Sequence, residues 1–301
     1  MRALVISGGG SKGAFGGGVA QYLMEELGHT YDLYIGTSTG SLLISHLALG
    51  KIQKIKEVYT SVNQSSIFSH CPFNTKKDKW GQEQIGINHW SVLRNFSRGS
   101  KTFGESHNLR ELIGRFLTRE EFEELQAGPK DIVVTVSNLS LHETEYKSIK
   151  EVTYEDFCDW IWISCNYIPF MSLVKKDGCE YADGGFGSMV PIKEAVDRGA
   201  TEIDVIILET EVTYYNSLPS KNVFSLLTNL HSFMIDRIEK QNITIGKFAA
   251  NNKDAIINLY YTPIVLTTNS LVFNKEKMAQ WWERGFIYAA SKNLELNEIR
   301  D

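Results

Sequence analysis

The sequence predicts an α/β fold in which a parallel sheet is covered by helices. From the N-terminus onward, short apolar runs alternate with segments of helical periodicity. This order of strand, helix, strand and helix is typical of parallel sheets, because the connection between two parallel strands crosses one face of the sheet. With 301 residues, 43% of them hydrophobic, the chain can bury the core of one such domain.

The predicted elements follow one another closely in the first fifty residues. Ala3–Ser7 and Leu33–Ile35 are expected to form buried strands. The helices that follow them are expected at Val19–Leu27 and Leu42–Leu49. A glycine-rich turn comes directly after each strand, so the sequence predicts two strand–turn–helix units in succession.

The later elements continue the same arrangement. Asp131–Ser137 and Ile203–Leu208 predict two more buried strands, and Pro191–Arg198 predicts a helix closed by a glycine. The arms Met171–Lys176 and Cys179–Ala182 are joined by an Asp-Gly pair, which is typical of a β-hairpin.

Further helices are expected to cover this core. Ser106 begins one of them, Thr118 and Glu121 form a capping box at the start of another, and Asn274 caps a last helix. A longer helix is marked by apolar residues at helical spacing, namely Val223, Leu226, Leu227, Leu230, Phe233 and Met234.

Two stretches lie outside the core pattern of what we expect to be a single domain, residues 1–301. Residues 61–128 are interpreted as an insertion or lid, because their first part is polar and dotted with glycines; the alternative is a small subdomain with an aromatic core. Residues 209–301 are expected to form a mainly helical covering segment. The aromatic residues of the first stretch are Phe68, Phe73, Trp80, Trp90, Phe96 and Phe103.

Charge and cysteine content exclude several classes of function. A net charge of -5 provides no basic field to attract nucleic acid. The four cysteines are irregularly spaced and form no C-x-x-C pair, so neither a disulfide framework nor a zinc site is predicted, and a cytoplasmic location is expected. No apolar run approaches the roughly 20 residues of a membrane-spanning helix, and the run after Arg2 is too short for a signal peptide.

The glycine-rich turn after the first strand reads GGGSKG, residues 8–13. Its spacing matches the G-x-G-x-x-G dinucleotide fingerprint, in which glycine lets the backbone approach a pyrophosphate. Asp32 lies at the distance of the expected acidic residue, but at the beginning of its strand. Ala14 stands where a P-loop requires lysine. Nucleotide binding is therefore the weakest of the hypotheses that we retain.

The second strand is followed by GTSTG, residues 36–40, which matches the G-x-S-x-G nucleophile elbow. Gly36 and Gly40 stand where a tight strand–turn–helix leaves no room for side chains. Such a turn exposes the Ser38 hydroxyl at the carboxyl end of the sheet. It also directs the amide of Thr39, at the positive end of the next helix, toward a developing oxyanion.

A serine nucleophile needs a base, and two residues are candidates for that role. His231 is late in the chain, as an α/β-hydrolase triad requires, but it lies within an amphipathic helix and is interpreted as a surface or packing residue. Asp183 follows the predicted hairpin and precedes Gly184 and Gly185, which free the backbone to hold its carboxylate at an unusual angle. Taken alone, Asp183 is more readily interpreted as an ordinary turn residue.

Together, GGGSKG, GTSTG and the ADGG of residues 182–185 resemble the motifs of the patatin-like phospholipase family. The SCNYIP of residues 164–169, the hairpin after it and the helix and strand of residues 191–208 are also similar to the family's layout. The resemblance covers most of residues 1–50 and residues 129–208. It implies a three-layer α/β/α hydrolase fold with a central, mostly parallel sheet.

The resemblance further implies a serine lipid acyl hydrolase of phospholipase A or lysophospholipase type. Ser38 and Asp183 would form a catalytic dyad without histidine, metal or cofactor. Its substrate would be a phospholipid or lysophospholipid, reached by peripheral contact with a membrane, and a protein partner could regulate it. The implied oxyanion hole consists of the amides of Gly8, Gly9 and Gly10, and the motif residues that shape the loops are Lys12, Gly13, Gly36, Gly40, Gly184 and Gly185.

Besides nucleotide binding, two alternatives to a dyad hydrolase remain open at this point. The first is a non-catalytic lipid or acyl-chain binding protein on the same fold. The second is an esterase with a triad completed by His231. Residues 61–104 and 272–288 are rich in aromatic side chains and are candidates for contact with a lipid interface, although Trp281 and Trp282 also have the spacing of core residues.

Overall fold

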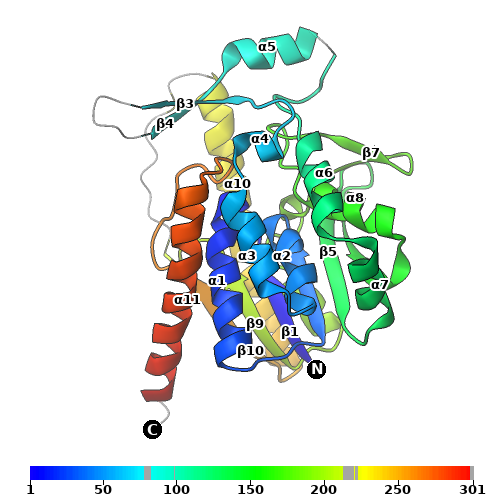
Figure 1. Cartoon of the computed structure of the whole chain (residues 1–301), viewed down its shortest axis with the longest axis vertical. Coiled ribbons are helices and arrows are strands. Elements are labelled where there is room, and N and C mark those ends of the chain that lie inside the picture. The colour runs from blue at the N-terminus through cyan, green and yellow to red at the C-terminus, as the bar shows by residue number, and fades with distance from the viewer. Residues whose placement is uncertain (78–82, 98, 213–219, 221–222, 299–301) are drawn as a thin grey trace.

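The computed structural model describes residues 1–77, 83–97, 99–212, 220 and 223–298. Its centre is an eight-stranded sheet with the order β10-β9-β1-β2-β5-β8-β7, in which β6 also pairs with β5 (Figure 1). The strands of this sheet are β1 (Arg2–Ile6), β2 (Leu33–Thr37), β5 (Asp131–Asn138), β6 (Glu143–Ser148), β7 (Val174–Lys176), β8 (Cys179–Asp183), β9 (Glu202–Ile207) and β10 (Ile256–Tyr261).

Most of the sheet is parallel. The pairs from β10 through β9, β1 and β2 to β5 are all parallel. By contrast, β6 and β8 pair with β5 in the antiparallel sense, and β7 and β8 form the hairpin that the Asp-Gly turn predicts. The predicted, mostly parallel sheet is therefore confirmed.

Helices cover both faces of the sheet. Along β1, Leu4 and Ile6 belong to one hydrophobic core, whereas Ala3 and Val5 belong to another on the opposite face. The second core is covered by α9 (Ile192–Asp197) and α10 (Val223–Asn252). These two cores give the three-layer α/β/α arrangement that the sequence predicts. The first core is covered by α1 (Gly13–Gln21), α2 (Thr39–Ala48), α3 (Ile52–Ser61), α4 (Gln64–Ile67), α6 (His107–Phe116), α7 (Arg119–Ala127), α8 (Tyr154–Ser164) and α11 (Lys275–Glu298).

The first helix begins earlier than its sequence predicts. Instead of Val19–Leu27, α1 covers Gly13–Gln21 and continues into a π turn, η2 (Tyr22–Glu26). Glycine is a poor helix former, but here its lack of a side chain is required by packing. A Cβ at Gly17 or Gly18 would collide with Trp282 of α11. Close packing of α1 on α11 therefore outweighs the low helix propensity of the glycine run.

Residues 61–128 contain more regular structure than their sequence indicates. Beyond α4, they form an antiparallel hairpin of β3 (Phe73–Lys77) and β4 (Glu83–Ile87), followed by α5 (His89–Ser97), α6 and α7. The capping box of Thr118 and Glu121 is present at the start of α7. The aromatic residues of this stretch divide: Phe68 is buried, whereas Trp90 on α5 is 82% exposed, and Trp80 lies outside the described residues.

Residues 209–298 are mainly helical, but they also supply the edge strand β10, which the sequence did not predict. The side chain of Asn274 caps α11 by accepting a hydrogen bond from the amide of Lys277 (3.0 Å). Trp281 and Trp282 of α11 are buried in the core, so this part of residues 272–288 does not face a lipid interface. No helix within the described residues is both long enough and apolar enough to cross a membrane.

Candidate active site

Ser38 lies in a sharp turn between β2 and α2. Its backbone angles, φ 52° and ψ -122°, are strained for a residue with a side chain. A Cβ at Gly36 would lie 2.5 Å from the amide nitrogen of Ser41, and one at Gly40 would collide with the carbonyl oxygen of Ile6. The two glycines of GTSTG therefore let the chain turn this tightly, as the elbow motif requires.

Strand register explains how Asp183 reaches Ser38 from 145 residues away. Thr37, the last residue of β2, pairs with Thr135 of β5. Asp183, the last residue of β8, pairs with Val136 of the same strand. Because β8 runs antiparallel to β5, its end meets the carboxyl end of β2. The Ser38 hydroxyl donates a hydrogen bond to Asp183 Oδ2 (2.6 Å).

Hydrogen bonds fix both the carboxylate and the backbone of Asp183. Its second oxygen, Oδ1, accepts a hydrogen bond from the Gly185 amide (2.8 Å), and its own amide donates to the carbonyl of Asn166 (2.9 Å). Asp183 is only 1% exposed, and this burial raises its pKa from 3.8 to about 7, although the bonds from Ser38 and Gly185 favour the charged form. A carboxylate with this pKa can accept a proton from a hydroxyl near neutral pH far better than a solvated aspartate.

Contacts from α2 and α8 fix the backbone around Ser38. The Ser38 amide donates to Ser164 Oγ (2.8 Å). The Ser38 carbonyl accepts hydrogen bonds from Ser41 Oγ (2.6 Å) and from Cys165 Sγ (3.1 Å). Ser164, Cys165 and Asn166 thus support the site, and the SCNYIP motif was the only sign of their role in the sequence.

The glycine loop lies beside Ser38 but does not supply every amide that was predicted. The Gly8 amide donates to the carbonyl of Met189 (3.3 Å). We therefore leave Gly8 out of the candidate oxyanion donors. Within the described part of the chain, the amides of Gly9, Gly10 and Thr39 have no hydrogen-bond acceptor, and all three residues line the cavity that contains Ser38.

Gly10 is fixed by the segment that precedes α11. It has a φ of 55°, and a Cβ there would collide with the carbonyl oxygen of Ser270. The next amide, that of Ser11, donates to the same carbonyl (2.8 Å). The loop is thereby anchored on one side to a segment that sequence reasoning did not connect with the site.

The remaining motif residues shape the surroundings of the serine. Gly13 faces Thr39, and Gly184 faces the backbone of Thr135, each at a distance that leaves no space for a Cβ. Lys12 is 5% exposed, and its ammonium pairs with Glu209 at the end of β9.

Two acidic residues near Lys12 were not predicted. Glu209 is the partner of Lys12, and Glu239 of α10 lies in the wall of the same cavity. Burial, with help from the charge of Glu209, raises the pKa of Glu239 to about 8, whereas Lys12 opposes this shift. Neither carboxylate stands in a sequence motif, because Glu239 lies within a long helix and reaches the cavity only through tertiary packing.

The cavity has a volume of about 660 Å³ and is lined by both apolar and charged side chains. Ser38 and Asp183 lie in its wall together with the glycine loop. Six apolar lining residues belong to the first hydrophobic core or pack against it, namely Leu42, Ile67, Leu109, Met171, Leu271 and Phe273. Besides Asp183, the charged lining residues are Lys12, Glu209, Glu211, Asp236, Glu239 and Lys240, and the last three of these lie on α10.

Histidine does not take part in the Ser38–Asp183 pair. His231 packs against the rings of Tyr167 (4.8 Å between centroids) and Phe186 (5.2 Å), and burial lowers its pKa. The hydrogen-bond partners of Ser38 and Asp183 among the described residues include no histidine. The described residues also contain no group of three or more His, Cys, Asp or Glu that could hold a metal ion.

Fold and site together define an α/β protein with a serine elbow at the end of one strand and a buried aspartate at the end of another. Residues 4–196, which include both, match the family model of patatin-like phospholipases. The chain belongs to the patatin-like phospholipase family. No curated protein sequence matches it.

Solved structures support the same fold. The crystal structure of VipD from Legionella pneumophila is similar to this chain with a TM-score of 0.50 and 16% sequence identity. The similarity covers 96% of this chain and 66% of the VipD chain. This chain therefore spans just under two thirds of VipD's length, and at this identity the likeness concerns the fold alone.

Proposed function

We propose that the protein is a serine lipid acyl hydrolase of phospholipase A or lysophospholipase type, in which Ser38 is the nucleophile and Asp183 the general base. The observation that carries the proposal is the direct hydrogen bond between Ser38 Oγ and a buried carboxylate whose pKa is about 7. Membership of the patatin-like phospholipase family supports lipid acyl chains as the substrate class.

In the first half of the reaction, the Ser38 hydroxyl transfers its proton to Asp183 while Oγ attacks the ester carbonyl carbon. The carbonyl oxygen becomes an oxyanion, for which the amides of Gly9, Gly10 and Thr39 in the cavity wall are the proposed donors. Asp183 then returns the proton to the leaving alcohol as the C–O bond breaks. An acyl group remains on Ser38.

In the second half, water replaces the alcohol. Asp183 takes a proton from the water, whose oxygen attacks the acyl carbonyl and forms a second oxyanion in the same place. The bond to Ser38 Oγ breaks, and the serine recovers the proton from Asp183. The products are a fatty acid and the free enzyme, so one carboxylate serves both steps.

A fluorophosphonate probe tests this proposal directly, because it reacts only with an activated serine. We expect the wild-type protein to gain one probe per chain, on Ser38, and the Ser38→Ala protein to gain none. Peptide mass spectrometry locates the adduct. A folded wild-type protein that stays unlabelled would favour a non-catalytic lipid-binding protein instead.

We propose that α10 contacts the membrane through an apolar stripe, which consists of Val223, Leu226, Leu227, Leu230, Phe233 and Met234. All six apolar residues that mark this helix in the sequence are more than half exposed, for example Leu226 (58%) and Leu230 (53%). Phe233 is both exposed and part of the cavity wall, so the stripe borders the catalytic cavity. An exposed apolar patch of this kind is typical of interaction surfaces.

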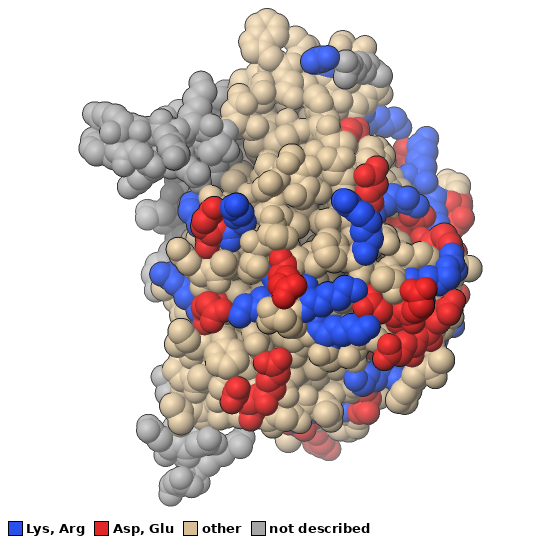
Figure 2. Space-filling model, viewed as in Figure 1, with Lys and Arg blue, Asp and Glu red and all other residues tan. Residues whose placement is uncertain are grey.

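Helix α5 is expected to extend this membrane-contacting surface. It exposes Trp90 and Leu93, and Figure 1 places it at the same end of the molecule as the beginning of α10. Figure 2 shows that this end carries few charged side chains on the face in view, whereas charges gather over the middle and lower parts. The net charge of -5 gives no general attraction to anionic lipid, so apolar insertion is the expected source of affinity.

Charged substitutions on the stripe are expected to weaken membrane binding. Leu226→Glu with Leu230→Glu should lower the partition of the protein onto phosphatidylcholine vesicles by roughly tenfold to a hundredfold, because two apolar side chains no longer enter the bilayer. Ile287→Glu on α11, another exposed apolar residue, is the matched control and should bind as the wild type does. Vesicle flotation measures the effect, and equal losses in both proteins would contradict the assignment.

A further inference from the structure

We propose that an apolar chamber beside the catalytic cavity holds the distal part of the substrate's acyl chain; this inference rests on the proposed hydrolase function. The chamber has a volume of about 60 Å³ and lies between α2, α3 and α6. Four side chains, Leu42, Ile67, Leu109 and Phe273, line both the chamber and the catalytic cavity. The two spaces therefore meet at these residues.

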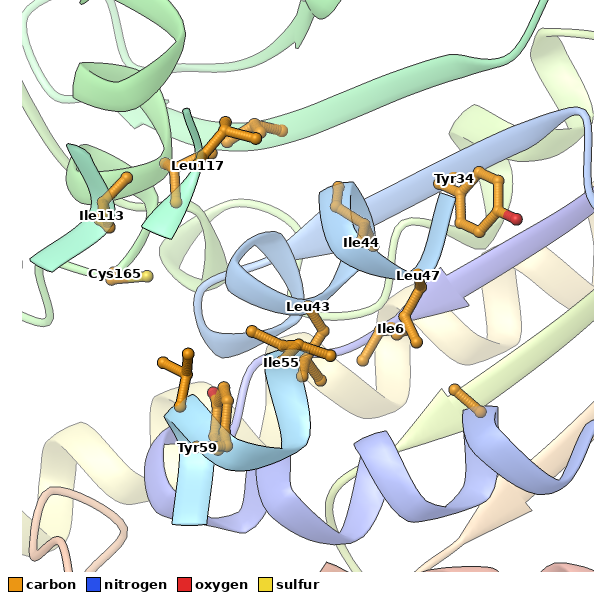
Figure 3. Close-up of a cluster of buried hydrophobic side chains, with 14 of the residues drawn as sticks. Ile6, Tyr34, Leu43, Ile44, Leu47, Ile55, Tyr59, Ile113, Leu117 and Cys165 are labelled. Carbon is orange, nitrogen blue, oxygen red and sulfur yellow. The ribbon is translucent and has the colours of Figure 1, made fainter. Parts of the chain in front are cut away.

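The chamber wall is built from the apolar faces of three helices. Figure 3 shows Ile55 on α3 next to Leu43 of α2, and Ile113 on α6, and both isoleucines line the chamber. Its polar members are Ser45 and His46 of α2 and Tyr59 of α3. Among the residues that the structure describes, Ser45 Oγ and His46 Nδ1 have no hydrogen-bond partner. Burial lowers the pKa of His46, so its ring is uncharged at neutral pH. The wall carries no charge and suits a hydrocarbon chain.

The polarity of the catalytic cavity determines the direction in which the chain would lie. The charged residues that line the cavity, among them Lys12 and Glu239, do not line the chamber, whereas the four shared residues are apolar. An ester that reacts with Ser38 would place its polar head group near the charged residues. Its acyl chain would then point toward Leu42 and Leu109, which lead into the chamber.

The size of the chamber sets an expectation for chain-length preference. A cavity of about 150 Å³ holds one benzene molecule, or about 25 Å³ for each CH group, so the chamber accommodates roughly two methylene groups. Each methylene that moves from water into the chamber is expected to raise kcat/KM by about fourfold. The increase should level off once the chamber is full.

Two substitutions on different helices are designed to fill the chamber. Ser45→Leu on α2 and Leu112→Phe on α6 both add bulk at residues that line the chamber but not the catalytic cavity. Glu111→Phe on α6 is the matched control, because it adds a ring on the exposed side of that helix, at a residue that lines neither space. Hydrolysis of p-nitrophenyl butyrate and p-nitrophenyl dodecanoate is measured for each protein, with circular dichroism as the check of folding.

We expect the filled variants to lose roughly tenfold or more in kcat/KM for the dodecanoate and to keep the rate for the butyrate within about twofold, because only the longer chain enters the chamber. Glu111→Phe should keep the wild-type profile. Folded variants that retain the dodecanoate rate, or that lose both rates equally, would contradict the proposal that the chamber holds the acyl chain.

Binding of fatty acids separates this inference from the proposed function and does not depend on the filled variants. Calorimetric titration of Ser38→Ala with octanoate and dodecanoate should show tighter binding of the longer acid, whether or not the wild-type protein is active. Equal affinities, or no binding of either acid, would contradict the proposal that the chamber holds the acyl chain. Failure of the hydrolase proposal would appear instead as a wild-type protein that releases no fatty acid from any ester.

Discussion

Ser38→Ala is expected to lower fatty-acid release from phospholipid vesicles by on the order of 10⁴-fold or more, because no other group can form the acyl-enzyme. Asp183→Asn should cause a loss of at least roughly 10²–10⁴-fold, since an amide at that position can orient the serine but cannot accept its proton. The double variant should be no worse than Ser38→Ala alone, because the two residues act as one unit. Rates of release, measured by titration of the free acid, check all three expectations.

Substitution of the late histidine is the control for this result. His231→Ala is expected to retain most of the wild-type rate, because His231 packs against Tyr167 and Phe186 and forms no hydrogen bond with the dyad. A folded His231→Ala protein as inactive as Ser38→Ala would replace the dyad with a triad. Activity that survives in Ser38→Ala would remove Ser38 from the mechanism altogether.

The parts of the fold that could be predicted from sequence are those with local patterns. Continuous apolar runs mark the buried strands β5 and β9, because parallel strands covered on both faces have no polar side. β6 lacks such a run, since most of its side chains are only half buried, and β10 is likewise half buried along most of its length. β10 joins the sheet through β9, which lies far from it in the chain, whereas β6 pairs with β5, which directly precedes it. Neither strand is marked by a continuous apolar run.

In the site, too, some features have a local sequence pattern and others depend on tertiary structure. The elbow is predictable because the backbone of Ser38 requires glycine two residues before and after it. The position of Asp183 follows from its pairing with Val136, and the sequence indicates it only through the motif. Glu209 and Glu239 lie outside every motif, because a helix and a strand end bring them to the cavity. Local geometry is encoded locally, whereas the charge of the cavity depends on tertiary structure.

The pH dependence of catalysis should follow the ionisation of Asp183. With a pKa of about 7, this carboxyl is increasingly protonated at acidic pH and can no longer act as a base. We expect kcat/KM to fall about tenfold for each pH unit below 7, so that activity at pH 5 is roughly a hundredfold below the plateau. A pH–rate profile with soluble p-nitrophenyl butyrate measures this without changes in membrane binding. A profile that stays flat down to pH 5 would contradict a base of raised pKa.

The same pKa has a consequence for stability, with a definite sign. The folded protein binds the Asp183 proton more tightly than the unfolded chain, whose pKa is 3.8. As pH rises from about 4 to 7, the folded state therefore bears the increasing cost of a buried charge, and the free energy of unfolding falls. Asparagine at this position carries no charge and avoids that cost. Asp183→Asn should thus be inactive yet more stable than the wild type at pH 8, by up to about 4 kcal/mol.

Urea unfolding of wild type and Asp183→Asn at pH 4, 6 and 8 tests this expectation. The difference in unfolding free energy should be largest at pH 8 and close to zero at pH 4, where the folded wild type is already protonated. Other titrating groups, Glu239 among them, are present in both proteins and cancel in the comparison. A difference that does not change with pH, or a variant less stable at pH 8, would show that burial does not penalise the Asp183 carboxylate. The structural basis for its action as a base would then be lost.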